Sequence, residues 1–359
     1  MQSSPENTGS RQRDDDDTPA FTRLADLASA RVGGRAIAAS DDFFAPRANL
    51  LKPDPAVFVP GKFTSRGKWM DGWESRRKRT PGHDWCVIEL GMRGRVRGVD
   101  VDTSFFVGNH PSHCSIEALD TTRPVSKAIA GRAGAPWTTI LPESSLQGDS
   151  HNYFAIDQQG SAHAPGPDGS AWTHLRLNIH PDGGVARLRA HGDVVVDWTP
   201  VARAGRAVDL ASIRNGGLVL GASDMHFGAR DNMIMPGRAR NMGDGWETRR
   251  RRGPGHDWAI VRLGAPGRLT RVEIDTNHFK GNYPDSASLE GCLAEADTVA
   301  ALASVRWLPI LPQTKLRADH RHVFSSGLLS GGAVSHVRLN IFPDGGISRL
   351  RLYGTLAPA

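Results

Sequence analysis

The stretch DGWESRRKRTPGHDW at residues 71–85 returns as DGWETRRRRGPGHDW at residues 244–258. Twelve of the fifteen positions are identical, and the second copy begins 173 residues after the first. Each copy brings two tryptophans, acidic residues, a histidine and a run of basic residues into one turn-rich segment. A fold needs turns, but it does not need this set of side chains twice. The segment therefore indicates an internal duplication and is the first candidate for chemistry.

The duplication covers most of the chain. Residues 26–29 recur at 209–212, residues 140–142 at 310–312, and residues 174–192 at 336–354, the last pair with thirteen of nineteen positions identical. The distance between copies falls from 183 to 162 along the chain, which indicates loop insertions between retained elements. We predict two domains, residues 23–198 and 208–359, joined by a linker at 199–207 and preceded by a disordered polar tail at 1–22.

The elements of each copy have the period of β-strands. Apolar residues alternate at two matching sites, Cys86, Ile88 and Leu90 and then Ala259, Val261 and Leu263, and a glycine after each run predicts the end of the strand. A second strand follows at 99–103 and 272–276, with its acids expected to point outward. The PDGG at 181–184 and 343–346 predicts a bulged hairpin, and the only helices expected are short, such as Thr22–Ala30. This pattern predicts an all-β chain of two antiparallel sandwiches.

Composition excludes several classes of protein. No apolar run approaches the ~20 residues that cross a bilayer, and the first residues are polar, so we expect neither a membrane segment nor a signal sequence. Three cysteines without a C-x-x-C spacing favour a reducing compartment, which predicts a cytoplasmic protein. The net charge is +6, but basic and acidic residues are interleaved and form no long cationic stripe, so we expect no nucleic-acid partner.

The repeated segment supplies the first candidate site residues. The acid/base candidates are Glu74, His83 and Asp84 in the first copy and Glu247, His256 and Asp257 in the second. Arginine binds carboxylates in bidentate fashion, and the anchor candidates are Arg76, Arg77, Arg249 and Arg250. The alternatives are a solvated basic face, a His-Asp pair that only caps a strand, and Trp73 and Trp246 as plugs of the sandwich rather than pocket walls.

Polar residues at a strand end give a second group of candidates. They are Asp102, Thr103 and Asn109 in the first copy and Asp275, Thr276 and Asn282 in the second. The alternative is an Asx-type turn in which these side chains satisfy their own backbone. Phe105 is replaced by His278 in the second copy and Val107 by Lys280. We therefore include His278 among the catalytic candidates and expect the second copy to be better supplied.

Metal and cofactor chemistry find little support in the sequence. The His320-Arg-His322 spacing stands without a matching carboxylate, and a polar strand explains it more simply. A nucleophile elbow, a phosphate-binding loop and a dinucleotide fingerprint are all absent. We expect neither a metal nor a cofactor, with assistance from a divalent ion as the open alternative.

With WE[ST]RR[KR]R…GHDW, a following VDVDT…F…GN and a terminal RLNI…PDGG, most of them present in both copies, the chain resembles the allantoicase family. The resemblance covers residues 21–354. It implies two galactose-binding-like jelly rolls in tandem, a homo-oligomer, and a cytosolic hydrolase of purine catabolism. The implied reaction converts allantoate and water to (S)-ureidoglycolate and urea.

The candidate residues suit this chemistry, because allantoate carries one carboxylate and two ureido groups on its central carbon. An acid protonates the departing nitrogen, the other ureido nitrogen assists, and water attacks the imine-like carbon. We assign the acid/base role to His256 or His278 with Asp257 or Glu247, and the ureido groups to Asp275, Thr276 and Asn282, or to their equivalents in the first copy. The alternatives are a non-catalytic tandem module that binds a small molecule or carbohydrate, and a related enzyme for another ureido acid.

Overall fold

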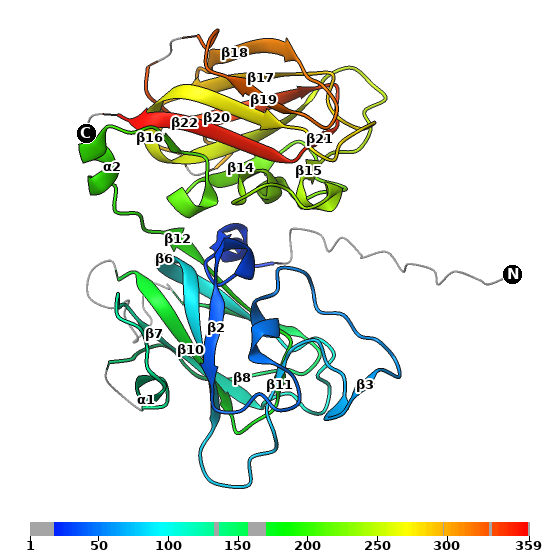
Figure 1. The fold of residues 1–359 in the computed structure, drawn as a ribbon, viewed down its shortest axis with the longest axis vertical. Coiled ribbons are helices and arrows are strands. Elements are labelled where there is room, and N and C mark those ends of the chain that lie inside the picture. Colours follow the sequence, from blue (N-terminus) through cyan, green and yellow to red (C-terminus); the bar gives the residue numbers. More distant parts are fainter. Residues whose placement is uncertain (1–17, 133–135, 157–169, 297, 330–331, 358–359) are drawn as a thin grey trace, which may run out of the picture.

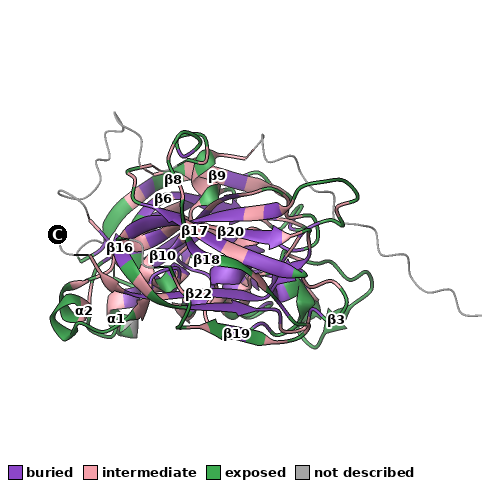
Figure 2. Cartoon of the chain, turned by 90° about the horizontal axis from the view of Figure 1, so that it is seen from above, coloured by how far each residue is buried: buried purple, intermediate pink, exposed green. Residues whose placement is uncertain are grey.

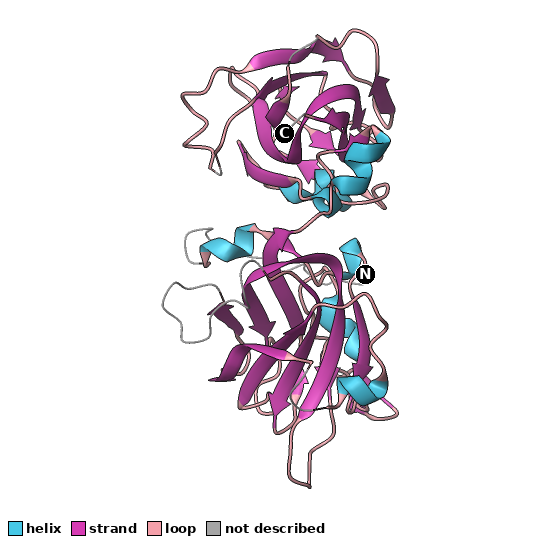
Figure 3. Ribbon diagram, turned by 90° about the vertical axis from the view of Figure 1, so that its left-hand side faces the viewer, coloured by secondary structure: helices cyan, strands magenta, loops and turns pink. Residues whose placement is uncertain are grey.

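The structure, a computed structural model, describes residues 18–132, 136–156, 170–296, 298–329 and 332–357. Two β-sandwiches lie one above the other along the long axis, as Figure 1 shows, which confirms the tandem all-β fold. Their helical segments are short and lie outside the sheets (Figure 3). Helix α2 (Thr199–Ala204) occupies the segment expected as linker. The predicted tail falls outside the described residues as far as residue 17, and η1 (Ala20–Arg23) is a 3-10 turn.

Each repeat has the same order of elements. The strands of the first are β1 (Ala25–Asp26), β2 (Arg35–Ala39), β3 (Phe63–Thr64), β4 (Gly67–Lys68), β5 (Trp73–Glu74), β6 (Asp84–Asp102), β7 (His113–Leu119), β8 (Thr138–Ser145), β9 (His151–Ala155), β10 (Trp172–His180), β11 (Gly184–Val185) and β12 (Arg187–Val194). Its other helical segments are η2 (Ala30–Val32), η3 (Arg47–Leu51) and α1 (Lys127–Ala130). The pair β3–β4 belongs to the first repeat alone among the described residues.

The second repeat follows the same plan. Its strands are β13 (Val208–Asp209), β14 (Leu218–Ala222), β15 (Trp246–Glu247), β16 (Asp257–Asp275), β17 (Ser286–Cys292), β18 (Leu308–Lys315), β19 (Arg321–Phe324), β20 (Val334–Phe342), β21 (Gly346–Ile347) and β22 (Arg349–Leu356). Its 3-10 turns are η4 (Ile213–Asn215), η5 (Arg230–Ile234) and η6 (Met242–Asp244). No helix among the described residues is long and apolar enough to cross a membrane.

The main strands of each repeat form one continuous eight-stranded sheet, folded into the two layers of the sandwich. One long strand runs through both layers, which we call the two sheets of the sandwich. The first half of β6 pairs with β2 and β10, and its second half pairs with β12 and β9. The prediction that the strand ends at Gly91 is wrong, and the same holds for Gly264 in β16. Both glycines lie inside the strand because η2 and η4 approach so closely: an added Cβ would stand 2.6 Å from the carbonyl oxygen of Val32 and 1.6 Å from that of Asn215.

The two ends of β6 meet at the same end of the sandwich. The amide of Asp84 donates to the carbonyl of Pro181 at 3.0 Å, and the amide of Ala186 donates to the carbonyl of Asp102 at 2.7 Å. Because only a few residues join Pro181 to Ala186, the 19-residue strand must turn back on itself. We call this the loop end, and it contains the repeated segment 71–85.

The PDGG at 181–184 is a crossover between sheets rather than a hairpin, so that prediction is wrong. Strand β10 pairs with β6 and β7, and β12 pairs with β6 and β1, but β10 and β12 do not pair with each other. Gly183 has a φ of 139°, as the turn residues suggested. The turn chemistry was visible in the sequence, but the partner of each strand was not.

The helix expected at Thr22–Ala30 is also wrong. The segment forms η1, the two-residue strand β1 and the start of η2. The amide of Leu27 donates to the carbonyl of Ala190 at 2.8 Å, and the Asp26 carboxylate accepts the amides of Ala28 and Ala190. Pairing with β12 therefore outweighs the weak helical preference of this short segment.

The core follows the predicted alternation, and Figure 2 shows buried strands beneath exposed loops. All six residues predicted to face inward at 86–90 and 259–263 are buried, and Trp73 and Trp246 are fully buried plugs. The expectation that the acids of the second strand face solvent is wrong, since Asp100 and Asp102 are 6% and 3% exposed. Asp100 accepts a hydrogen bond from Nδ1 of His151 on β9 at 2.7 Å, which shows what covers this face.

The two repeats contact each other through arginines. Nη1 of Arg31 donates to Oδ1 of Asn232 at 2.6 Å, and the same guanidinium forms an ion pair with Asp244, which is 6% exposed. In return, Nη2 of Arg214 donates to the carbonyl of Val32 at 2.6 Å. Asp244 is the first residue of the second copy of the repeated segment. The ion pair with Arg31 therefore links that segment to the first repeat.

Candidate functional site

A groove lies on the outer face of one sheet in each repeat. In β10 the hydrophobic core takes Leu175, Leu177 and Ile179, so the side chains between them face away from the core, although they too are buried. The same alternation holds for β7. The first groove, of about 410 Å³, is lined by His83, Trp85, Ser115, Glu117, Gly131, Thr139, Pro142, Glu143, Arg176 and Asn178. The second groove, of about 570 Å³, is lined by His256, Trp258, Ser288, Leu289, Glu290, Pro309, Leu311, Pro312, Gln313, Arg338, Asn340 and Phe342.

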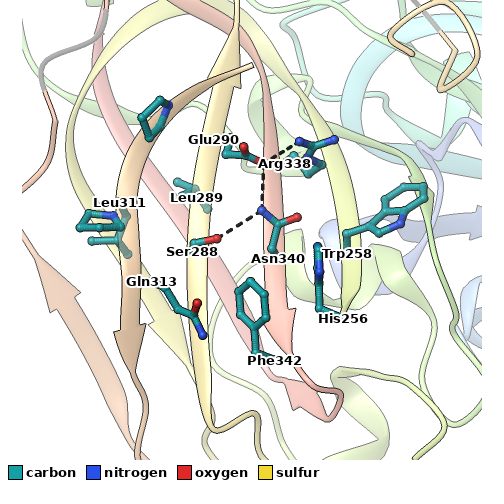
Figure 4. Close-up of a pocket in the computed structure, with 12 residues that line it drawn as sticks. His256, Trp258, Ser288, Leu289, Glu290, Leu311, Gln313, Arg338, Asn340 and Phe342 are labelled. Atoms are coloured by element: carbon teal, nitrogen blue, oxygen red, sulfur yellow. Dashed lines mark hydrogen bonds and ion pairs between the residues drawn. The ribbon is translucent and has the colours of Figure 1, made fainter. Parts of the chain in front are cut away.

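Strand register builds the polar floor of the groove. In the second repeat, Arg338 on β20 stands opposite Glu290 on β17, and Asn340 stands opposite Ser288. Nη2 of Arg338 lies 2.7 Å from Oε2 of Glu290. Nδ2 of Asn340 donates to the same carboxylate oxygen at 2.9 Å and to Oγ of Ser288 at 3.2 Å (Figure 4). The floor is therefore one connected network of an ion pair and an amide.

The first groove repeats this network. Nη2 of Arg176 lies 2.5 Å from Oε2 of Glu117. Nδ2 of Asn178 donates to Glu117 at 2.8 Å and to Oγ of Ser115 at 3.2 Å. Each guanidinium also stacks on a tryptophan, Arg176 over Trp137 in the first groove, at 4.8 Å from the ring centroid. The duplication has kept the geometry as well as the residues.

One atom of each network has no partner. Oδ1 of Asn178 and Oδ1 of Asn340 are buried acceptors without a hydrogen bond. Asn178 is 4% exposed and Asn340 5%, so bulk water does not replace the missing donor. Buried carbonyl oxygens are normally satisfied by a donor, and an unsatisfied one costs roughly 1–3 kcal/mol. An N–H group of a bound ligand would satisfy it. The same unsatisfied atom in both repeats makes the groove the candidate binding site.

Electrostatics keep the carboxylate of this network ionised. Burial raises the pKa of Glu290, but the hydrogen bond from Asn340 and the guanidinium of Arg338 outweigh burial and hold that pKa below its usual value. Ionised Glu290 can accept protons and hydrogen bonds but cannot act as an acid at neutral pH. A proton donor in the second groove must therefore come from another residue.

The predicted histidines lie at the grooves, but their aspartates do not. His83 and His256 line the two grooves, and the ring of His256 lies 4.7 Å from the ring of Phe342. Asp84 and Asp257 start the long strands and point to the opposite, buried face. Asp84 accepts from Ser40 at 2.8 Å and pairs with Lys78 at 2.9 Å; Asp257 accepts from Ser223 and pairs with Arg251. The structure brings no His-Asp dyad together here.

The predicted glutamates lie at the loop end rather than in the grooves. Oε1 of Glu74 accepts from Nδ2 of Asn109 at 2.8 Å, and Glu247 accepts from Asn282 in the same way. Burial raises the pKa of Glu74 and of Glu247, and the amide bond offsets only part of that rise. In the first repeat this pair lines a separate cleft of about 420 Å³ with Lys68, Phe44 and Phe105 among its walls.

The four arginines predicted to anchor the substrate face solvent. Arg76 pairs with Asp41 at 2.6 Å, and Arg249 pairs with Asp224 at 3.1 Å. Arg77 and Arg250 are exposed, and neither forms an ion pair with another residue in the part of the chain that the structure describes. None of the four lines either groove.

The polar residues at the strand ends build turns. Asp102 accepts the amide of Ser104 at 2.8 Å, and Asp275 accepts the amide of Asn277 at 2.9 Å. The hydroxyls of Thr103 and Thr276 are fully buried and donate to loop carbonyls, at 2.6 Å to that of Gln147 in the first repeat. His278 has a φ of 71° and its Nε2 lies 3.0 Å from the carbonyl of Ala239.

Groups of three or more potential metal ligands are absent from the described ranges. His320 and His322 have rings 4.7 Å apart, but His322 is bound to backbone: its Nε2 accepts the amide of Arg317 at 2.9 Å, and its Nδ1 lies 3.1 Å from the carbonyl of Ile274. These residues therefore do not form a metal centre by themselves.

The groove floor was not among the candidates from sequence. Its residues are Ser115, Glu117, Arg176 and Asn178, with Ser288, Glu290, Arg338 and Asn340 in the second repeat. The pattern was present: S-x-E recurs at 115 and 288, and R-L-N recurs at 176 and 338. A polar residue that repeats at every outward position of a strand is the feature that could have identified them.

The fold and the paired grooves define a tandem β-sandwich protein with a polar ligand groove on one sheet of each repeat. Comparison with known proteins assigns the family. The chain belongs to the allantoicase family, whose repeat model, "Allantoicase repeat", matches residues 25–195 and 208–357.

Curated relatives and a solved structure agree. The chain is 49% identical over 345 residues to a probable allantoicase 1 of Burkholderia mallei, covering 95% of this chain and 98% of the relative. It is 48% identical to a probable allantoicase of Ralstonia nicotianae, with 95% and 98% covered. The crystal structure of allantoicase from Saccharomyces cerevisiae has a TM-score of 0.76 at 33% identity, covering 92% of this chain and 93% of that one.

Proposed function

We propose that this chain is a hydrolase that converts allantoate and water to (S)-ureidoglycolate and urea in purine catabolism. Membership of the allantoicase family and near-complete coverage of relatives at about 50% identity support the activity. The observation that supports a reaction in the groove is the unsatisfied carbonyl oxygen of Asn340 beside the Arg338–Glu290 ion pair. Ureido N–H groups are donors for that carbonyl, and a guanidinium is a partner for the carboxylate of allantoate.

The residues of the second groove can perform the proton transfers. His256 donates a proton to the departing ureido nitrogen, the C–N bond breaks, and neutral urea leaves while the lone pair of the remaining ureido nitrogen forms an imine-like carbon. Water then attacks that carbon and gives its proton back to His256. The reaction consumes one water for each urea released, and the proton that His256 donates returns to it. Ionised Glu290 stabilises the cationic intermediate and the histidinium, and Trp258 forms part of the groove wall.

Urea release tests this proposal. The purified chain is incubated with allantoate, and urea and ureidoglycolate are measured over time. Equal amounts of both products support the proposal. Binding of allantoate without urea would favour the alternative, a non-catalytic tandem binding protein. Release of urea from another ureido acid, but not from allantoate, would favour the related enzyme.

The proposal includes a cytoplasmic homo-oligomer that needs neither a metal nor a cofactor. The cysteines Cys86, Cys114 and Cys292 are buried and unpaired, as suits a reducing compartment. Light scattering during size-exclusion chromatography measures the oligomer. Activity that survives dialysis against a chelator supports metal independence, and activity restored by a divalent ion would contradict it.

A further inference from the structure

The two grooves share their floor but differ in how far their arginine is exposed. The side chain of Arg338 is 32% exposed and that of its partner Glu290 28%. The equivalent values for Arg176 and Glu117 are 5% and 14%. The same pair of charges is therefore open to a ligand in the second repeat and closed in the first.

Backbone carbonyls occupy the donors of Arg176 in the first groove. Nη1 of Arg176 donates to the carbonyl of Ala130 at 2.8 Å and to that of Arg132 at 2.7 Å, both at the end of α1. Its Nε donates to Glu117 at 2.7 Å and its Nη2 pairs with the same carboxylate. Every nitrogen of this guanidinium is occupied, so it has no edge left for a bidentate carboxylate.

Arg338 keeps one edge free. Its Nε and Nη2 both bind Glu290, at 2.9 Å and 2.7 Å, and its Nη1 has no hydrogen bond to any residue in the described part of the chain. The guanidinium lies over Trp307, 4.9 Å from the ring centroid, which holds its plane in place. Nη1 is thus a positioned donor without a partner among the described residues, and Arg338 lines the groove beside Glu290 (Figure 4).

A difference in charge also favours binding of an anion in the second groove over the first. Glu143 on β8 lines the first groove, and Gln313 takes the equivalent place on β18 in the second. Both side chains are exposed. The first groove therefore carries one more negative charge, which repels a carboxylate, while Arg338 and Glu290 leave the second balanced apart from its histidine.

We propose that the second groove alone takes the substrate carboxylate, on Nη1 of Arg338, so that each chain has one working site. The inference rests on the proposed function. Oδ1 of Asn340 then accepts the N–H of a ureido group on the same central carbon. The first groove keeps the equivalent acceptor on Asn178 but has no cation to offer, and it does not turn allantoate over.

An isosteric pair of variants tests the assignment. Gln313→Glu gives the second groove the charge of the first, and Glu143→Gln gives the first groove the neutral residue of the second. Both positions are exposed, and the Ser286 hydroxyl, which accepts from Nε2 of Gln313 at 2.8 Å, can donate to a glutamate there instead. We expect Gln313→Glu to raise KM for allantoate about tenfold at low salt, less at high salt, and Glu143→Gln to stay within about twofold of the parent. Equal effects, or a larger effect of Glu143→Gln, would overturn the assignment.

Binding measurements separate this inference from the activity itself. N-carbamoylglycine carries the carboxylate and one ureido group but has no second ureido group to lose. Calorimetry of the full chain should give one site per chain, weakened about tenfold by Gln313→Glu. That result supports the assignment even if allantoate releases no urea, which would reject only the proposed activity. Two equal sites per chain, no binding, or no effect of Gln313→Glu on binding would reject the assignment.

Discussion

The two grooves contain the same histidine, tryptophan, serine, glutamate, arginine and asparagine, yet their surroundings differ. The last residue of α1 and Arg132 just after it supply carbonyls to Arg176, whereas Nη1 of Arg338 has no hydrogen bond among the described residues. His83 packs against His180, whereas His256 packs against Phe342. A duplicated site can therefore diverge through its neighbours while its own residues stay the same.

The largest contrast is expected from removal of the two arginines. Arg338→Gln should lower kcat/KM about a thousandfold, because the substrate loses its carboxylate partner and Glu290 loses its ion pair. Arg176→Gln should instead lower the free energy of unfolding by about 3 kcal/mol, because Glu117 and two carbonyls lose a buried donor. Urea-release kinetics and denaturant unfolding measure the two effects. Loss of activity in a stable Arg176→Gln protein would reverse the comparison.

The histidines provide the next contrast. His256→Ala should lower kcat about a hundredfold, because no other described residue that lines the second groove can exchange a proton near neutral pH once Glu290 is held ionised. His83→Ala should have a smaller effect, since its groove lacks an open arginine. Urea-release kinetics of the two variants measure this contrast. An unchanged kcat in His256→Ala would remove His256 from the mechanism.

A smaller difference is expected at the first aspartate of each repeated segment. Asp71 pairs with Lys52 of its own repeat, and Asp244 pairs with Arg31 of the other repeat. Arg31→Ala should lower stability by about 1–2 kcal/mol and separate the thermal unfolding of the two repeats. Lys52→Ala should cost less than about 1 kcal/mol, because that lysine is 44% exposed. Calorimetry that shows one shared transition in Arg31→Ala would argue against coupling through this contact.

The smallest effect concerns the loop-end glutamates. Burial raises the pKa of Glu74 and Glu247, so each folded carboxyl holds its proton more tightly than the unfolded one. Their ionisation therefore lowers stability as pH rises from the unfolded pKa through the raised folded value. Glu247→Gln and Glu74→Gln should be slightly more stable than the parent at pH 7, and that gain should shrink at about pH 4. Unfolding midpoints at both pH values measure this, and a pH-independent difference would contradict it.

Much of the fold could be predicted because the duplication repeats every pattern. The inward residues of β6 and β16 and the glycine of the PDGG turn follow from local periodicity. Strand pairing does not, since β10 and β12 are separated in sequence only by a turn and the two-residue β11, yet both pair with β6 rather than with each other. The glycines at 91 and 264 looked like strand ends because a close approach by another segment leaves no trace in local sequence.

The site was harder to predict for a related reason. The repeated segment attracted attention because its residues are contiguous, and it supplied His83 and His256 to the grooves. The floor of the first groove comes from two strands far apart in the chain, β7 and β10, and its polar residues alternate with core residues, as in any half-buried strand. The cluster of Arg176, Glu117 and Asn178 exists only once β10 lies between β6 and β7.

The long strand β6 has a consequence for how each repeat comes apart. Since its two halves belong to different sheets, neither sheet can open along this strand without loosening the other. A partly unfolded repeat with one intact sheet should therefore be scarcely populated. Amide protons at Val87 and Val101, on opposite halves of the strand, should exchange with solvent at similar rates.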